Sequence, residues 1–145
     1  MAKKKTEKKK GERPPPSCKA IIIAAKTIIE EGTGLISIIG VFDGFTFKEF
    51  PGKTREAELY LQLVDGVGEY EITVEVQDLQ QNIVIARATG ITVGFPERLQ
   101  RRTLIIPMPL LTLQHPGAYD VVVFANGQEI DRQQFFVKMN APEGD

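Results

Sequence analysis

The chain has 145 residues and a formal net charge of −1, which suits one ordinary domain and excludes two large ones. Its single cysteine, Cys18, excludes an intramolecular disulfide, and with no secretory signal visible we expect a reducing, cytoplasmic setting. The longest apolar runs, such as residues 20–25, are far shorter than the ~20 residues that span a bilayer.

The charge is distributed unevenly. Residues 1–20 carry eight Lys or Arg and two Glu, a net +6, whereas the remaining residues sum to −7. Residues 1–16 lack apolar periodicity and end in a run of prolines, so we predict a disordered Lys/Pro-rich tail. Such a tail either binds nucleic acid or an anionic surface, or keeps the chain soluble, which is the commoner role. The candidate polyanion-binding residues are Lys3, Lys4, Lys5, Lys8, Lys9 and Lys10.

A single β-domain is predicted over residues 17–139, followed by a flexible end at 140–145. Residues 18–25 are apolar at successive positions, which predicts a buried strand. Residues 35–42 have the same character and predict a second buried strand. The glycine-containing segment 27–34 between them predicts a hairpin with a longer connection.

The clearest pattern in the chain is EYEITVEVQ at residues 69–77. Apolar and polar residues alternate there, and a strand sends successive side chains to opposite faces, so one face is buried and the other is wet. Residues 57–65 alternate in the same way. The sequence Asp65-Gly66-Val67-Gly68 lies between the two segments and predicts that they form a central hairpin.

The next segments carry two irregularities. Residues 83–93 form a predicted strand in which Gly90 indicates a bulge or a close backbone approach. Residues 99–113 contain Pro107 and Pro109, which remove two N–H donors from one side of a strand. That pattern is typical of an edge strand or of a crossover between sheets.

The last predicted element is a hairpin with Asn126-Gly127 at its turn, joining strands at 119–125 and 128–138. One bulge near residues 131–133 would place Phe135 opposite Tyr119. No segment shows a helical period over ten or more residues. The sum predicts an all-β fold: an antiparallel two-sheet β-sandwich, immunoglobulin-like or similar, of about seven or eight strands.

Residues capable of chemistry are sparse. His115 is the only histidine and precedes a turn, where a surface role is commoner than catalysis, and Cys18 beside a buried strand acts as a small hydrophobe. Glu69, Glu71 and Glu75 share one strand face, which could bind a cation or a basic peptide but more often keeps a sheet soluble. We therefore expect no catalytic residue, metal or cofactor, and a non-enzymatic protein.

A group of phenylalanines is the best candidate for an interaction surface. Aromatic side chains in irregular segments often anchor partners, although plugging an open end of a sandwich is the commoner role. The residues are Phe42, Phe45, Phe47 and Phe50.

The landmarks together resemble a family of small, uncharacterised bacterial β-sandwich proteins, a domain of unknown function. The matching sequences cover about residues 17–138, and the resemblance implies a fold without implying any activity, catalytic residue or binding residue. The matches are Ser17-Cys18-Lys19-Ala20, Ile38-Ile39-Gly40-Val41-Phe42-Asp43-Gly44, Gly68-Glu69-Tyr70-Glu71, Pro116-Gly117-Ala118-Tyr119 and Asn126-Gly127.

Three hypotheses about function follow. The first is a protein-interaction module that binds an unknown protein partner or a second copy of itself through an edge strand. The second is nucleic-acid or anionic-surface binding through the tail. The third is a ligand-binding or hydrolytic sandwich with a site built from scattered carboxylates. Fold alone does not choose among them.

Overall fold

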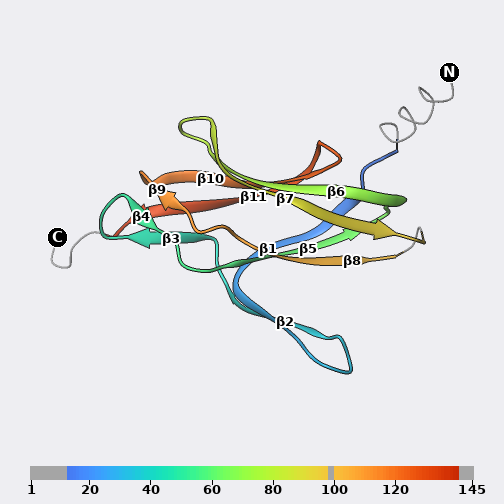
Figure 1. Ribbon diagram of the computed structural model, residues 1–145. Coiled ribbons are helices and arrows are strands. Elements are labelled where there is room, and N and C mark those ends of the chain that lie inside the picture. Colours follow the sequence, from blue (N-terminus) through green and yellow to red (C-terminus); the bar gives the residue numbers. More distant parts are fainter. Residues whose placement is uncertain (1–12, 98–99, 141–145) are drawn as a thin grey trace, which may run out of the picture.

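The computed structural model describes residues 13–97 and 100–140, and this part of the chain is all-β, with eleven strands in three sheets (Figure 1). No helix in these residues is long and apolar enough to cross a membrane. The strands are β1 (Ser17–Ile29), β2 (Ile36–Val41), β3 (Gly44–Phe47), β4 (Gly52–Lys53), β5 (Glu58–Val64), β6 (Gly68–Asp78), β7 (Ile83–Phe95), β8 (Arg102–Pro107), β9 (Thr112–Leu113), β10 (Gly117–Ala125) and β11 (Gln128–Met139).

The sheets have four, five and two strands, in the orders β2-β1-β5-β8, β3-β11-β10-β6-β7 and β4-β9. Neighbouring strands are antiparallel except for β3, which pairs parallel with β11, so the prediction of a wholly antiparallel architecture is wrong there. The strand count also exceeds the predicted seven or eight, because β3, β4 and β9 are short pieces within segments that carry no periodicity.

Both larger sheets send side chains into one hydrophobic core. Along β5 every second residue is buried, and Leu59, Leu61 and Leu63 are fully inaccessible. Along β6 the buried residues begin with Tyr70 and Ile72, while the glutamates between them face solvent. The alternation predicted for both segments is confirmed.

The pairing predicted for these two segments is wrong. β5 hydrogen-bonds to β1 and β8, whereas β6 hydrogen-bonds to β10 and β7 in the other sheet. The turn at Asp65–Gly68 therefore carries the chain from one sheet to the other. At Gly66, an added Cβ would lie 2.3 Å from the Phe95 ring, so this glycine permits the turn to pack against the core.

The second strand also differs from expectation. β2 pairs with β1 as predicted, but its residues are exposed or half-buried, so the prediction of a buried strand at 35–42 is wrong. β1 is longer than predicted and continues to Ile29, and the chain then turns at residues 30–35. Figure 1 shows the end of β1 and β2 leaving the body of the molecule together.

The predicted irregularities are confirmed. The register between β6 and β7 shifts between Ile72 and Val74, opposite Gly90, which has a φ of 79°. β8 lies at the edge of the four-stranded sheet and ends at Pro107.

The last hairpin contains the inserted residue that its pattern required. Asn126 and Gly127 both have positive φ, as a two-residue hairpin turn demands, and Tyr119 pairs with Phe135 as predicted. The register shift falls between Val123 and Phe124, which pair with Asp131 and Glu129. Ile130 is therefore the inserted residue, just before the predicted segment.

The first described residues are anchored to the body. The Arg13 guanidinium donates hydrogen bonds to the carbonyl oxygens of Val67 (2.6 Å) and Glu69 (2.8 Å) and lies 4.8 Å from the centre of the Tyr70 ring. The Tyr70 hydroxyl donates to the Pro14 carbonyl oxygen at 3.0 Å. The predicted tail, residues 1–16, therefore includes residues that contact the domain, and its lysines lie outside the described residues.

Candidate functional site

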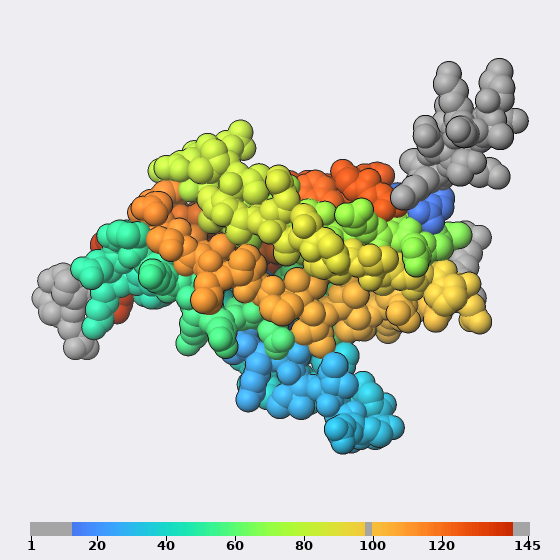
Figure 2. All heavy atoms as spheres, viewed as in Figure 1, coloured from blue at the N-terminus to red at the C-terminus, as the bar shows by residue number. Residues whose placement is uncertain are grey.

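The most distinctive surface of the molecule is the β-hairpin formed by the end of β1 and by β2, residues 25–41, which we call the arm. Figure 2 shows the arm extending from the body as a separate projection. Large apolar side chains on it are between 41% and 64% exposed: Ile28, Ile29, Leu35, Ile39 and Val41. A projection with this composition keeps apolar surface in water, which is costly unless something covers it.

The arm is held in a defined direction. The Glu58 carboxylate accepts hydrogen bonds from the Thr27 backbone N–H at 2.6 Å and from the Thr27 hydroxyl at 3.1 Å, which ties the arm to β5. At the tip, the Glu30 N–H donates to the Leu35 carbonyl oxygen at 2.8 Å and the Gly34 N–H donates to the Glu30 carbonyl oxygen at 3.0 Å. These contacts make the arm an ordered element.

The outer edge of β2 presents backbone groups that the described part of the chain does not pair. The Leu35 carbonyl oxygen faces β1, and successive residues of a strand point their backbone groups to opposite sides. The N–H and C=O of Ile36 and Ile38 therefore face away from β1. Thr27 supports this assignment, because it is the partner of Ile38 and its N–H is directed to Glu58 on the far side.

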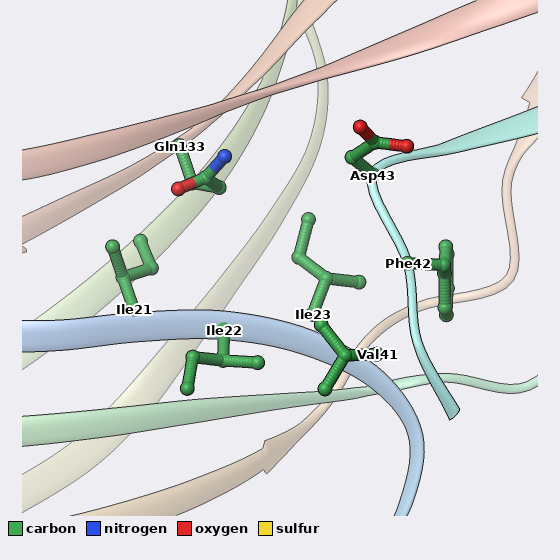
Figure 3. A pocket seen from close by; sticks show the side chains of 7 residues that line it. All are labelled: Ile21, Ile22, Ile23, Val41, Phe42, Asp43 and Gln133. Carbon is green, nitrogen blue, oxygen red and sulfur yellow. The ribbon is translucent and has the colours of Figure 1, made fainter. Parts of the chain in front are cut away.

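A hollow of about 370 Å³ lies at the base of the arm, where β2 leaves β1. Figure 3 shows Ile21 and Ile23 on the side of β1 that faces Gln133 and Asp43, and Ile22 on the opposite side. The Phe42 N–H donates to the Ile23 carbonyl oxygen at 3.0 Å, after which the chain turns away from β1. The hollow combines the apolar side chains of β1 and β2 with the carboxylate of Asp43 and the amide of Gln133, so it offers both apolar and polar contacts.

The four predicted phenylalanines lie together against the core. Ring centroids are 5.2 Å apart for Phe42 and Phe45, 6.2 Å for Phe45 and Phe47, and 5.7 Å for Phe47 and Phe50. Phe45 also contacts the buried Phe135 ring at 5.8 Å. All four are half-buried, so they close one end of the core as the commoner alternative expected.

His115 occupies a more enclosed position than a surface turn residue. Its Nε2 lies 2.6 Å from Oδ2 of the buried Asp78, its Nδ1 lies 2.7 Å from the Pro116 carbonyl oxygen, and its ring stacks on Tyr119. The hydrogen bond to Pro116 and the weaker contribution of Asp78 raise the pKa of His115, against the lowering effect of burial. Because both neighbours accept, the protonated ring satisfies both.

This geometry predicts a pH-dependent stability. A raised pKa in the folded state means that the stabilisation is fully present below the ordinary value of 6.5 and is lost as the pH rises through the raised value. Replacing His115 with Gln should cost about 1–2 kcal/mol at pH 5.5, and less at pH 8.5. Urea unfolding of both proteins from pH 5.5 to 8.5 measures the difference, and a difference that grows with pH would contradict the account.

Cys18 has the inert character that the sequence suggested. Its thiol is half-buried and donates to the Ala20 carbonyl oxygen at 3.3 Å. Burial and the nearby Asp131 carboxylate raise the pKa of Cys18 to about 11. The thiolate is therefore scarce at neutral pH, which makes Cys18 a poor nucleophile.

The acidic strand face is divided between two environments. Glu69 and Glu71 are exposed and line a hollow of about 280 Å³ together with Arg13 and Asn126, whereas Glu75 accepts a hydrogen bond from Arg87 at 2.8 Å. Among residues 13–97 and 100–140, no group of three or more His, Cys, Asp or Glu side chains is arranged to hold a metal ion. The tail lysines lie outside those ranges, so polyanion binding by them stays a prediction.

The sequence pattern does not indicate the arm as a candidate site, because its apolar residues predict a buried strand. One signal was nevertheless present in the sequence: residues 33–42 contain no charged residue and no proline. Natural edge strands usually carry such residues as protection against pairing. β2 is an edge strand in the structure, and it carries no such protection.

Comparison with known proteins places the chain in a family. The family of unknown function DUF6941 matches residues 20–138. The chain belongs to this family. The match confirms the predicted resemblance to a family of unknown function and covers most of the segment that the resemblance was expected to cover. No curated protein matches.

Solved structures resemble the chain only distantly. The alkylpurine DNA glycosylase AlkC of Pseudomonas fluorescens, bound to DNA containing an abasic site analogue, has a TM-score of 0.49 and 9% identity over 81% of this chain. A β-glucosidase of Listeria innocua has a TM-score of 0.43 and 14% sequence identity over 85% of this chain. The CARDB domain of the PF1109 protein of Pyrococcus furiosus, in complex with di-metal ions, has a TM-score of 0.40 and 12% sequence identity over 87% of this chain. The matches cover 30%, 16% and 96% of those chains, and likeness at this level carries no argument about function.

Proposed function

We propose that the chain is a non-enzymatic β-sandwich module whose function is to bind another polypeptide through the arm. The sandwich interpretation is supported by a single core to which the four-stranded and five-stranded sheets both contribute. In this proposal the body supplies rigidity and the arm supplies the contact surface.

The observation that carries the proposal is the exposed apolar surface of the arm. Leu35 and Val41 are 64% and 63% exposed, although neither is needed to close the core. Burying a large aliphatic side chain contributes about 1.5–3 kcal/mol, so several on one projection favour association strongly. Their concentration on an ordered hairpin distinguishes them from scattered surface residues, which need no explanation.

The backbone of the arm adds directional contacts to this apolar surface. Ile36 and Ile38 offer N–H and C=O groups along the outer edge of β2, so a partner strand can extend the four-stranded sheet. The hollow at the base of the arm, lined by Ile21 and Ile23, can then accept a side chain of the same partner. This combination is typical of strand addition, in which the backbone gives affinity and side-chain pockets give specificity.

The test compares two substitutions that add the same charge at different edges. Ile39→Lys changes the arm, and Ile83→Lys changes a comparably exposed isoleucine at the start of β7. Immobilised wild-type chain should capture a partner, of its own or another kind, and amide exchange should slow in residues 35–41 when that partner is added. Ile39→Lys should reduce capture at least tenfold and Ile83→Lys should not. Equal capture by all three chains would contradict the proposal.

A further inference from the structure

The larger sheets end in four edge strands, and three of them carry a feature that discourages pairing. β8 begins at Arg102 and ends at Pro107, β7 has two register shifts along its length, and β3 has four residues. β2 is the exception. Its register with β1 shows no shift, it carries neither charge nor proline, and it projects away from the body.

We propose that the partner of β2 is β2 of a second copy of this chain, paired antiparallel about a two-fold axis at Ser37. This inference rests on the proposed function of the arm and names its partner. The two four-stranded sheets then become one continuous eight-stranded sheet with a β2–β2 junction at its centre.

The backbone fixes the register. Along the regular part of β2, residues 36–39, Ile36 and Ile38 direct their N–H and C=O groups outward, and Gly40, with a φ of 71°, interrupts the alternation. A two-fold pairing of this regular part matches these two isoleucines with each other. With Ser37 on the axis, Ile36 of one copy pairs with Ile38 of the second copy. By symmetry, Ile38 of the first copy pairs with Ile36 of the second, which completes the ladder. All the outward groups of both residues are then hydrogen-bonded. Moving the axis to Ile36 or to Ile38 would bring Gly34 or Gly40 into the ladder, and their φ values of 72° and 71° do not fit a regular strand.

The side chains match in the same register. Opposed residues of a strand pair share a face, so the isoleucines at positions 36 and 38 of both copies form one apolar cluster. On the other face, Leu35 of each copy lies opposite Ile39 of the second copy, and the two Ser37 side chains face each other across the axis. Leu35 and Ile39 are 64% and 41% exposed in the single chain, so pairing covers surface that is otherwise wet.

Charge and shape permit two copies to approach in this way. The part of the chain after residue 20 has a net charge of −7, which opposes contact between two bodies, whereas residues 33–42 are uncharged. The arm projects from the body, so its outer edge is accessible to another arm (Figure 2). A contact of this size is below the ~20–30 residues a side of a standard interface, so we expect a dissociation constant in the micromolar range.

Cysteine cross-linking tests the pairing directly. In a Cys18→Ser background, Ser37→Cys places two thiols across the axis in a non-hydrogen-bonded pair, where the expected Cα separation of about 4.5 Å suits a disulfide. Thr46→Cys, on the exposed β3 edge, is the matched control. Mild oxidation at about 100 μM should cross-link Ser37→Cys at least tenfold faster than Thr46→Cys. Equal rates would overturn the inference.

A mixed experiment tests the register. Chains carrying Leu35→Cys and Ile39→Cys should cross-link to each other faster than either does to itself, because these positions oppose one another only when Ser37 lies on the axis. Light scattering should show the mass rising from 16.1 kDa toward twice that value with concentration, and Ile39→Lys should abolish the rise.

The outcomes separate this inference from the proposed function. A single-chain mass at every concentration, with no preferred cross-link, would overturn the self-pairing even if arm-dependent capture of another protein were retained. Loss of arm-dependent capture as well would contradict both. Preferred cross-linking between Leu35→Cys and Ile39→Cys would support both.

Discussion

Replacing Phe45 with alanine should lower the free energy of unfolding by about 2–3 kcal/mol. Removing a fully buried phenylalanine costs roughly 3–5 kcal/mol, and Phe45 is half-buried, with ring contacts to Phe42, Phe47 and Phe135. The effect is on stability because these rings close the end of the core. Urea unfolding followed by far-ultraviolet circular dichroism measures it.

Phe136 provides a matched control for this substitution. It follows Phe135 in β11, but its side chain is 43% exposed, so Phe136→Ala should cost less than about 1 kcal/mol. Self-association of Phe45→Ala, corrected for the unfolded fraction, should equal that of the wild type. If Phe45→Ala instead left stability unchanged and abolished association, the phenylalanines would be the interaction surface and the arm would not.

Replacing Arg132 with methionine should destabilise the protein by about 2–3 kcal/mol. Arg132 donates a hydrogen bond of 2.7 Å to the carboxylate of Asp120, whose side chain is 6% exposed in the middle of the five-stranded sheet. Breaking a buried ion pair costs roughly 3–5 kcal/mol because a charge is left without a partner, and the 42% exposure of Arg132 reduces that value. Methionine keeps the packing of the aliphatic stem, so the measured loss reports the charge.

Two further variants isolate the buried carboxylate. Glu129 is the other partner of Arg132, but its side chain is 40% exposed, so Glu129→Gln should change the free energy of unfolding by less than about 0.5 kcal/mol. Asp120→Asn in the Arg132→Met background removes the unpaired charge and should recover part of the loss. A double variant as unstable as the sum of the single ones would show that the pair is not coupled.

The sequence predicts which residues face the core more securely than it predicts which strands are neighbours. Alternation along 57–65 and 69–77 states only that one face of each strand is buried. Because both larger sheets bury a face in the same core, the pattern is satisfied equally by a hairpin and by a crossing between sheets. Turn residues such as Asp65 and Gly68 allow either outcome. In the structure, the chain crosses from the four-stranded to the five-stranded sheet between β5 and β6.

The last hairpin was predictable for the opposite reason. Asn126-Gly127 specifies a two-residue turn, and with the ends fixed the side chains of Tyr119 and Phe135 set the register. The inserted residue follows from that constraint alone, although its position at Ile130 depends on local packing. Here the local chemistry and the long-range pairing require the same answer.

The arm shows why the candidate site was harder to predict. An apolar, uncharged segment is expected inside the protein, and residues 35–42 meet that description. In the structure β2 is an edge, so the same composition becomes an exposed surface. An apolar sequence pattern indicates that a strand is suited to burial. It does not indicate whether the strand is buried by the rest of its own chain or by a second chain.

Amide hydrogen exchange at Ile36 and Ile38 tests the role of the arm most directly, because both N–H groups face away from β1. The account predicts that these amides exchange slowly in concentrated wild-type protein and become fast on dilution or in the Ile39→Lys variant. The Ser37 amide, which faces β1, should remain protected throughout. Fast exchange at Ile36 and Ile38 at every concentration, with and without a captured partner, would contradict the account.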